Sequence, residues 1–264
     1  MALKRQKTIR VAILQFASQD CFAQKNYETF NTLLKKLKRR VDLIVLPEMW
    51  LSGFDLSWST KLVQETDRVL KDLQRIAQTK KTYIVGSNLE KDGNAYYNTA
   101  SLISPSGKIL SKYRKTHLFK MGEEEKKFSH GNKIFITKTS IGNLGIAICY
   151  DIRFPELIRK MVLKGAEILI IPSAWPKKRI DHYLTLLKAR AIENHCFVIS
   201  ANKVGKNSLG IRYGGNSVAF DPWGRVLGKL KESSGILEVE LDLNELHRIR
   251  RSFPVLKDRR EEVY

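Results

Sequence analysis

The sequence predicts an α/β fold, because apolar runs of strand length alternate with amphipathic helical patterns along most of its 264 residues. Two segments with turn residues at their centres add antiparallel hairpins to this alternation. No linker, low-complexity tract or short repeat interrupts it. We therefore expect one domain over residues 1–264, in which parallel strands and their helices are combined with hairpins.

In the first half of the chain, strands are predicted where short apolar runs end at turn or helix signals. One helix is predicted at 27–40, where leucines recur at helical spacing, and a second at 62–80. A hairpin is predicted at 98–115, with Pro-Ser-Gly at its turn. The strands expected in this half are 9–16, 42–47 and 82–87.

The second half repeats this alternation and ends in a charged tail, residues 248–264, which we expect to wrap a neighbouring surface. A helix is predicted at 154–166, with Pro155 near its start and Gly165 near its end, where these residues are favoured. A second hairpin is predicted at 214–230, turning at Asp-Pro-Trp-Gly. The other expected elements are a helix at 182–195 and strands at 144–149, 167–173, 196–202 and 235–242.

Composition and charge narrow the class of protein. The net charge is +20, but the basic residues are spread along the chain and no nucleic-acid-binding motif occurs. A solvated basic surface is therefore favoured over a nucleic-acid partner. No apolar run approaches the roughly 18 residues that cross a bilayer, and the first residues lack a signal-peptide pattern. Three cysteines without paired spacing argue against a disulfide framework, so we expect a cytoplasmic protein without membrane contact.

Three predicted strand ends carry residues suited to catalysis. Cys149 ends an apolar strand before a helix, whose N-terminus favours a thiolate; the alternative is a small buried hydrophobe. Glu48 follows the second strand, where partial burial suits a carboxylate to act as a base; the alternative is a helix cap or a surface ion pair. Lys115 sits after a third strand, at the end of the predicted hairpin, and its alternative is a solvated lysine.

Other candidate side chains give weaker signals. The five histidines show no metal-binding spacing such as His-Glu-x-x-His, so no metal site is predicted. Cys196 lies in a strand pattern and fits a buried hydrophobe. Cys21 lies in a predicted loop, with no neighbour in the sequence that would activate it.

Three ordered motifs resemble the carbon–nitrogen hydrolase, or nitrilase, superfamily, and the resemblance covers nearly the whole chain. They are LPEMWLSGF (46–54), YRKTHLF (113–119) and CYDIRFPEL (149–157), with weaker similarity at 95–110, 189–205 and 258–264. The resemblance implies a four-layer α-β-β-α sandwich that pairs into a homodimer or a larger assembly. It also implies catalysis without a metal or an organic cofactor.

The resemblance assigns the catalytic glutamate, lysine and cysteine of the family to Glu48, Lys115 and Cys149. It further implies a second glutamate shortly after the lysine. Its distance from Lys115 favours Glu123, although the run of three glutamates at 123–125 leaves the register open. We expect Cys149 to form a thioester while Glu48 transfers protons. Lys115 and the backbone N–H of Tyr150 are the expected donors to the oxyanion.

Arg153 indicates the class of substrate. Its motif, Cys-Tyr-Asp-x-Arg-Phe, resembles the Nit-type branch, which includes ω-amidases and deaminated-glutathione amidases, whereas nitrilases usually have Cys-Trp-Glu. Arg153 could bind a substrate carboxylate; the alternative is an ion pair with Asp151 or Glu156. Trp175 could line the pocket; the alternative is a core aromatic.

We therefore expect an amidase that releases ammonia from a small carboxylate-bearing amide, with a 2-oxo acid ω-amide as the best candidate. Two alternatives within the superfamily are a hydrolase of N-carbamoyl amines or amino acids and a nitrilase. A more distant alternative, from a different class, is a basic protein that binds nucleic acid.

Overall fold

The computed structural model describes residues 8–57 and 59–263, which form two six-stranded sheets. The strands of the first sheet are β1 (Thr8–Gln15), β2 (Leu43–Val45), β3 (Tyr83–Asp92), β4 (Ala95–Ile103), β5 (Ile109–Arg114) and β12 (Gly235–Asp242). Their order is β12-β1-β2-β3-β4-β5. The central strands β1, β2 and β3 are parallel, whereas β4, β5 and β12 join by antiparallel pairing.

The second sheet repeats this plan. Its strands are β6 (Ile136–Thr139), β7 (Gly142–Ile146), β8 (Ile168–Ser173), β9 (Phe197–Asn202), β10 (Val218–Phe220) and β11 (Val226–Lys229). Their order is β11-β10-β9-β8-β7-β6, with β7, β8 and β9 parallel. Each sheet thus has three parallel strands, two further antiparallel strands on one side and one on the other. The carboxyl ends of the parallel strands form the edge at which α/β proteins place their sites.

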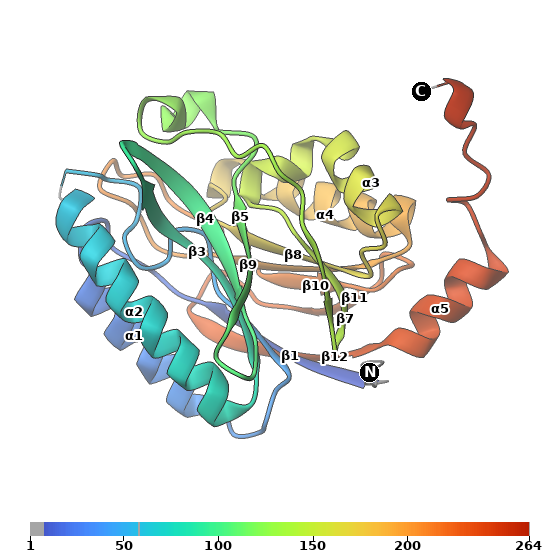
Figure 1. Cartoon of the computed structure of the whole chain (residues 1–264), viewed down its shortest axis with the longest axis horizontal. Coiled ribbons are helices and arrows are strands. Elements are labelled where there is room, and N and C mark those ends of the chain that lie inside the picture. The colour runs from blue at the N-terminus through green and yellow to red at the C-terminus, as the bar shows by residue number, and fades with distance from the viewer. Residues whose placement is uncertain (1–7, 58, 264) are drawn as a thin grey trace.

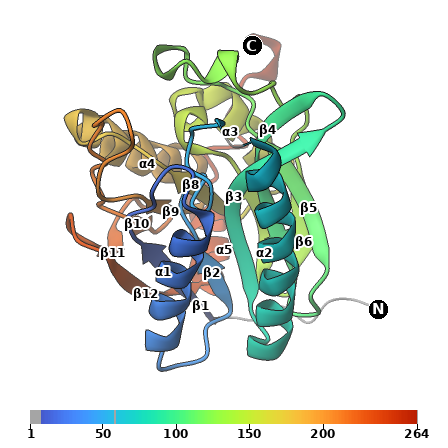
Figure 2. The ribbon, with the colours of Figure 1, turned by 90° about the vertical axis from the view of Figure 1, so that its left-hand side faces the viewer.

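Helices cover the outer faces of the two sheets. The first pair is α1 (Ala23–Lys36) and α2 (Ser59–Lys80), and the second is α3 (Pro155–Leu163) and α4 (Ile180–Asn194). Figures 1 and 2 show α1 and α2 on one side of the molecule and α3 and α4 on the other, with both sheets between them. This arrangement confirms the expected four-layer α-β-β-α sandwich. Within the described ranges, no helix is both long enough and apolar enough to cross a membrane.

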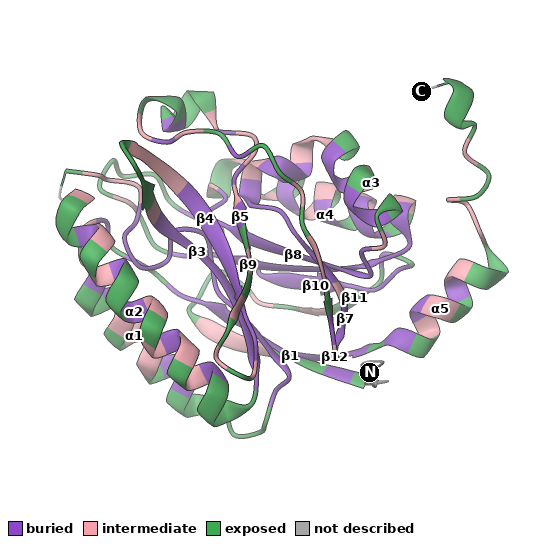
Figure 3. Cartoon of the chain, in the orientation of Figure 1, coloured by how far each residue is buried: buried purple, intermediate pink, exposed green. Residues whose placement is uncertain are grey.

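The apolar residues of the strands fill two layers of core, because successive side chains of a strand point to opposite faces. In β1, Ile9, Val11 and Ile13 pack between the sheets, whereas Ala12 and Leu14 pack against the side covered by α1 and α2. Figure 3 shows the buried residues concentrated on the strands and the exposed ones on the outer faces of the helices. The core between the sheets therefore fixes the position of one sheet on the other.

Most of the predicted elements are confirmed, and the differences have local causes. The helix predicted at 27–40 spans Ala23–Lys36 instead, since clustered basic side chains at its expected end repel one another. The strand predicted at 82–87 continues to Asp92, where Gly93, with a φ of +58°, allows a further hairpin into β4. The short edge strand β6 was not predicted.

The C-terminal tail only partly follows the prediction that it wraps a neighbouring surface. Residues Leu243–Ser252 form a helix, α5. Arg250 anchors the helix by donating hydrogen bonds to the carbonyls of His195 and Ala166. Beyond α5, Phe253 stacks on Trp223 and Leu256 packs against the core, and the segment that follows them extends away from the sheets (Figure 1).

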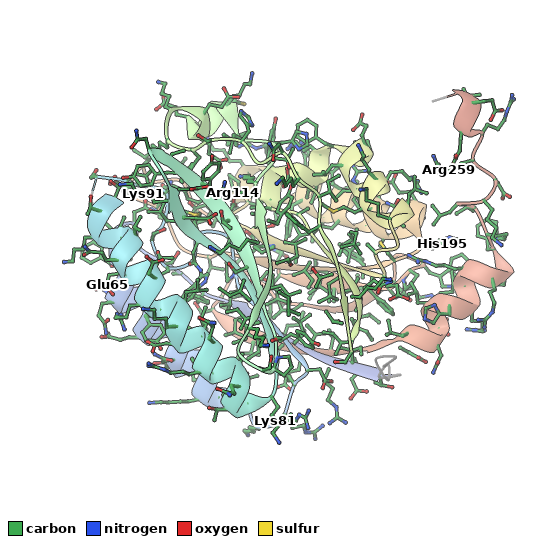
Figure 4. All side chains as sticks on the ribbon, in the orientation of Figure 1. Glu65, Lys81, Lys91, Arg114, His195 and Arg259 are labelled. Atoms are coloured by element: carbon green, nitrogen blue, oxygen red, sulfur yellow. The ribbon has the colours of Figure 1, made fainter. Side chains whose placement is uncertain are left out.

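Apart from a few buried ones such as Lys115 and Lys203, the basic residues are distributed over the exterior. The labelled side chains in Figure 4 include Lys81 at one end of α2, Lys91 and Arg114 near the far ends of β3 and β5, and Arg259 on the C-terminal segment. Arg114 forms ion pairs with Glu90 at 3.0 Å and Asp92 at 2.7 Å. These labelled cations lie in separate regions, and two of them, Arg114 and Arg259, are paired with carboxylates.

Candidate active site

The three predicted catalytic residues lie together at the carboxyl edge of the sheets. Glu48 follows β2, Lys115 follows β5, and Cys149 follows β7. Their exposed fractions are 1%, 1% and 8%, so all three are buried. They line one pocket of about 330 Å³, in which the base and the lysine come from the first sheet and the thiol from the second. The solvated and surface alternatives for Glu48 and Lys115 are therefore wrong.

A tight turn presents the thiol to this pocket. The strand predicted at 144–149 ends at Ile146, and Cys149 begins a 3₁₀ helix that continues to Arg153. Cys149 has a φ of +45°, a left-handed conformation that is strained for any residue with a Cβ. Such strain persists only where the surroundings enforce it, and here it marks the residue at the centre of the site.

Asp151 supplies much of that enforcement. Its carboxylate accepts a hydrogen bond from the N–H of Ile148 at 2.9 Å, just before the cysteine. It also accepts from the hydroxyl of Tyr113 at 2.7 Å and from the N–H of His117 at 2.9 Å. Asp151 is completely buried and thus joins the segment after β5 to the turn that carries the thiol.

Glu48 and Lys115 form the centre of a buried hydrogen-bond network. The ammonium of Lys115 donates to Oε1 of Glu48 at 2.7 Å and to the two carboxylate oxygens of Glu124 at 2.9 and 2.8 Å. Oε1 of Glu48 also accepts from the amide of Asn98 at 2.8 Å, and Glu124 accepts from the N–H of Phe119 at 3.0 Å. Two carboxylates therefore compensate one ammonium away from water.

The register within the run of three glutamates differs by one residue from the favoured expectation. Glu124, not Glu123, contacts Lys115. Glu123 has a left-handed backbone, with a φ of +56°, between two short 3₁₀ helices, and its exposed side chain pairs with Lys126 at 2.6 Å. The change of direction at Glu123 turns the next residue inward. We therefore correct the accessory glutamate from Glu123 to Glu124.

Burial and charge set the protonation of these groups. Burial raises the pKa of the Cys149 thiol well above its usual range, and the charge of Glu48 adds to this, whereas Lys115 opposes it. Burial alone would lower the pKa of Lys115, yet Glu124 and Glu48 outweigh it, so the pKa rises well above normal. The resting site thus holds a neutral thiol and a charged lysine, and attack by the thiol requires a base.

The rest of the pocket combines aromatic walls with cations that have no carboxylate partner among the described residues; the guanidinium of Arg153 contacts Nδ1 of His182 at 3.4 Å. The guanidinium of Arg153 lies 4.8 Å from the centre of the Trp175 ring. Among the described residues, no carboxylate lies within ion-pair distance of Arg153, so the predicted alternative of pairing with Asp151 or Glu156 is wrong. The indole N–H of Trp175 donates to the carbonyl of Arg179 at 2.7 Å, and both residues line the pocket. Trp175 is also 98% buried. It therefore both lines the pocket and belongs to the core, as the two predicted alternatives had it.

Several residues of the site give no distinct signal in the sequence and were not predicted. Asn98, which binds Glu48, lies within the resembling segment 95–110, but a single amide in a strand carries no separate signal. Arg179 and Lys127 line the pocket, and Lys203 lies behind its wall, in a chain with 47 lysines and arginines. In the described part of the chain, no group of three His, Cys, Asp or Glu side chains is arranged to hold a metal ion.

Comparisons with known proteins agree with this geometry. Residues 10–251 match the family model described as carbon-nitrogen hydrolase. A 2-oxoglutaramate amidase of Bacillus subtilis is 37% identical over 257 residues, covering 96% of this chain and 98% of its own length. An ω-amidase of Mus musculus is 28% identical, with 97% of each chain covered.

Solved structures are similar over the same extent. A carbon–nitrogen hydrolase of Helicobacter pylori has a TM-score of 0.89 and 31% identity, with 97% of each chain covered. An amidase of Nesterenkonia, in which acrylamide has added to the active-site cysteine, has a TM-score of 0.82 and 26% identity. That comparison covers 92% of this chain and 97% of the amidase.

Proposed function

Because the chain belongs to the carbon–nitrogen hydrolase family, in the nitrilase superfamily, we propose that it releases ammonia from the side-chain amide of a small 2-oxo acid. The chain is an amidase of this superfamily with an active-site cysteine. The proposal concerns the substrate and the roles of the residues. It rests above all on the guanidinium of Arg153, which lies in the pocket of the nucleophile and has no carboxylate partner among the described residues.

In the first half of the proposed reaction, the sulfur of Cys149 attacks the amide carbon while Glu48 takes the thiol proton. Lys115 and the backbone N–H of Tyr150 stabilise the negative oxygen of the tetrahedral intermediate. The carbon–nitrogen bond then breaks, and the departing nitrogen takes the proton from Glu48. Ammonia and a thioester of Cys149 result.

In the second half, Glu48 takes a proton from water, and the resulting hydroxide attacks the thioester carbon. Collapse of this intermediate breaks the carbon–sulfur bond and returns the proton to Cys149. The products are a carboxylic acid and the free enzyme. The contacts of Glu124 and Glu48 with Lys115 support this scheme, since they keep the lysine charged through both halves.

Charge around the pocket supports a substrate with a carboxylate. Arg153 is held against Trp175 without an acidic partner in the described ranges, so its guanidinium can bind a carboxylate with two parallel hydrogen bonds. Arg179 and Lys127 add positive charge to the same pocket. A volume of about 330 Å³ suits a small molecule, and relatives are named for 2-oxoglutaramate and ω-amide hydrolysis.

The proposed assembly is a homodimer or a larger homo-oligomer. A partly exposed aromatic group near α5, made by Trp223 and Phe253 with ring centroids 6.0 Å apart, supports a partner surface. The molar mass in solution, measured by light scattering, tests this assembly. A mass equal to one chain at micromolar concentration would contradict it.

A panel of substrates tests the function. Ammonia release is measured from 2-oxoglutaramate, 2-oxosuccinamate, glutamine, an N-carbamoyl amine, a simple aliphatic amide and a nitrile, with wild type beside Cys149→Ala. We expect the 2-oxo amides to react fastest and the variant to be inactive. Turnover of the carbamoyl compound or the nitrile alone would overturn the proposed substrate, and activity in the variant would overturn the nucleophile.

A further inference from the structure

A buried lysine that the proposed mechanism does not use lies behind the pocket wall. Lys203 directly follows β9 and is 1% exposed. Among the described residues, no carboxylate lies within ion-pair distance of its ammonium, in contrast to Lys115 with its two carboxylates. Burying a charge without a counter-charge is costly, so this ammonium needs an explanation beyond stability.

The ammonium of Lys203 is held by a carbonyl and two aromatic faces. It donates a hydrogen bond to the carbonyl of Met49 at 2.9 Å, a contact between residues 154 positions apart in sequence. It lies 5.2 Å from the ring centre of Phe54 and 5.7 Å from that of Tyr213, distances typical of cation–π contacts. Both rings line the pocket, so Lys203 supports its wall from behind.

The residue that Lys203 contacts adjoins the proposed base. Met49 has a φ of +44°, a strained left-handed conformation, directly after Glu48. This pair of residues is held from the first sheet by the hydroxyl of Ser87, which accepts from the N–H of Met49 at 2.9 Å. It is held from the second sheet by the carbonyl of Ser173, which accepts from the N–H of Glu48 at 3.3 Å.

We propose that Lys203 is a positioning residue for the reaction: its ammonium fixes the Met49 carbonyl and thereby holds the carboxylate of Glu48 at the thiol of Cys149. The proposal rests on the role of Glu48 as the base. Lys203 belongs to the second sheet, which also carries Cys149, while Glu48 belongs to the first. The contact therefore aligns the base with the nucleophile across the two sheets.

The charge of Lys203 makes this positioning sensitive to pH. Burial lowers its pKa to about 8, although the negative charges of Asp20 and Glu48 act to raise it. Tyr213, the other titratable group against the ammonium, has a pKa raised by burial and stays neutral in this range. Below pH 8 the ammonium is charged and holds the carbonyl most strongly, and above it this charge is lost.

The test measures the reactivity of Cys149 separately from turnover. Iodoacetamide alkylates the thiol, forming a carbon–sulfur bond as iodide leaves and the thiol proton passes to a base. The rate at Cys149 is followed by peptide mass spectrometry from pH 6 to 10, beside kcat and KM for 2-oxoglutaramate. The variants are Lys203→Met, Lys203→Arg and, as a control, Lys36→Met on the exposed end of α1.

We expect Lys203→Met to lower the alkylation rate and kcat about 10- to 100-fold, with KM changed less than about 3-fold, because displacement of a catalytic group costs this much. In wild type we expect kcat to decline above about pH 8. Lys203→Arg should retain more activity than Lys203→Met and should not show this decline, since arginine stays charged. Lys36→Met should match wild type. A wild-type alkylation rate in Lys203→Met, or an unchanged decline in Lys203→Arg, would overturn the proposal.

Stability separates positioning from a purely structural role. Replacing a buried unpaired charge with an apolar side chain of similar length should leave the Tm at pH 7 unchanged or higher. A lower Tm with normal kcat per folded molecule would assign Lys203 to stability alone and overturn the proposal. Glu48→Gln tests the premise that Glu48 is the base, independently of Lys203. If Cys149 in this variant is alkylated at the wild-type rate, Glu48 is not the base.

Discussion

The two sides of the pocket treat charge in opposite ways. On the first-sheet side, Lys115 is enclosed by Glu48 and Glu124, and each of these carboxylates has a further hydrogen-bond donor. On the opposite side, Arg153 lies against an aromatic ring without an acidic partner in the described ranges, and Arg179 lies 5.3 Å from the ring of Phe119. On the first side every charged group already has an oppositely charged partner before the substrate arrives, whereas on the second side the cations have none.

This difference indicates separate tasks. A closed network keeps its groups at fixed distances and in fixed protonation states, as bond breaking requires. A cation stacked on an aromatic ring retains its hydrogen-bond donors for an incoming anion. Changes on the closed side should therefore alter kcat, and changes on the open side should alter KM.

The largest expected effect follows the loss of the base. Glu48→Gln keeps the size of the side chain but cannot accept the thiol proton, so kcat should fall by about 10³-fold or more. KM should change little, since the cationic side is intact. The measurement is steady-state ammonia release, with near-ultraviolet circular dichroism as a control for folding. Retention of one tenth of wild-type kcat would contradict the assignment.

A smaller effect separates the two neighbouring glutamates. Glu124→Gln removes a charged partner of Lys115 and should lower kcat about 10- to 100-fold. The reason is that the ammonium of Lys115 is then held less firmly in its position in the site. Glu123→Gln is the matched control and should stay within about 2-fold, as its side chain is exposed and pairs with Lys126. Equal losses in both variants would contradict the corrected register.

The smallest effect on turnover is expected on the open side. Arg153→Met should raise KM for 2-oxoglutaramate about 10- to 100-fold, the worth of hydrogen bonds to a charged group, with kcat changed about 3-fold at most. A simple aliphatic amide without a carboxylate should show no such change. The comparison of the two substrates is the measurement, and an equal rise in KM for both would place Arg153 outside carboxylate recognition.

The sequence could predict the meeting of the main catalytic residues but not their supporting contacts. Strand ends are visible in the apolar pattern, but β2 and β7 belong to different sheets, so the pattern alone could not place Glu48 beside Cys149; the family resemblance did. The turn at Glu123 could not be predicted, because a left-handed residue other than glycine leaves no clear mark in the sequence. Neither could Lys203, whose importance depends on contact with Met49, far away in the chain.

Because the site is divided between the two sheets, the protein can lose activity on warming before it unfolds. The thiol of Cys149 belongs to one sheet and its proposed base, Glu48, to the other, and the packing between the sheets is largely apolar and therefore non-directional. A small slip between the layers can leave every strand and helix intact while separating the reacting atoms. Warming should abolish activity at a temperature below that at which the protein unfolds. A cavity in the core between the sheets, made by Val85→Ala, should lower the temperature of inactivation further, although Val85 does not touch the substrate.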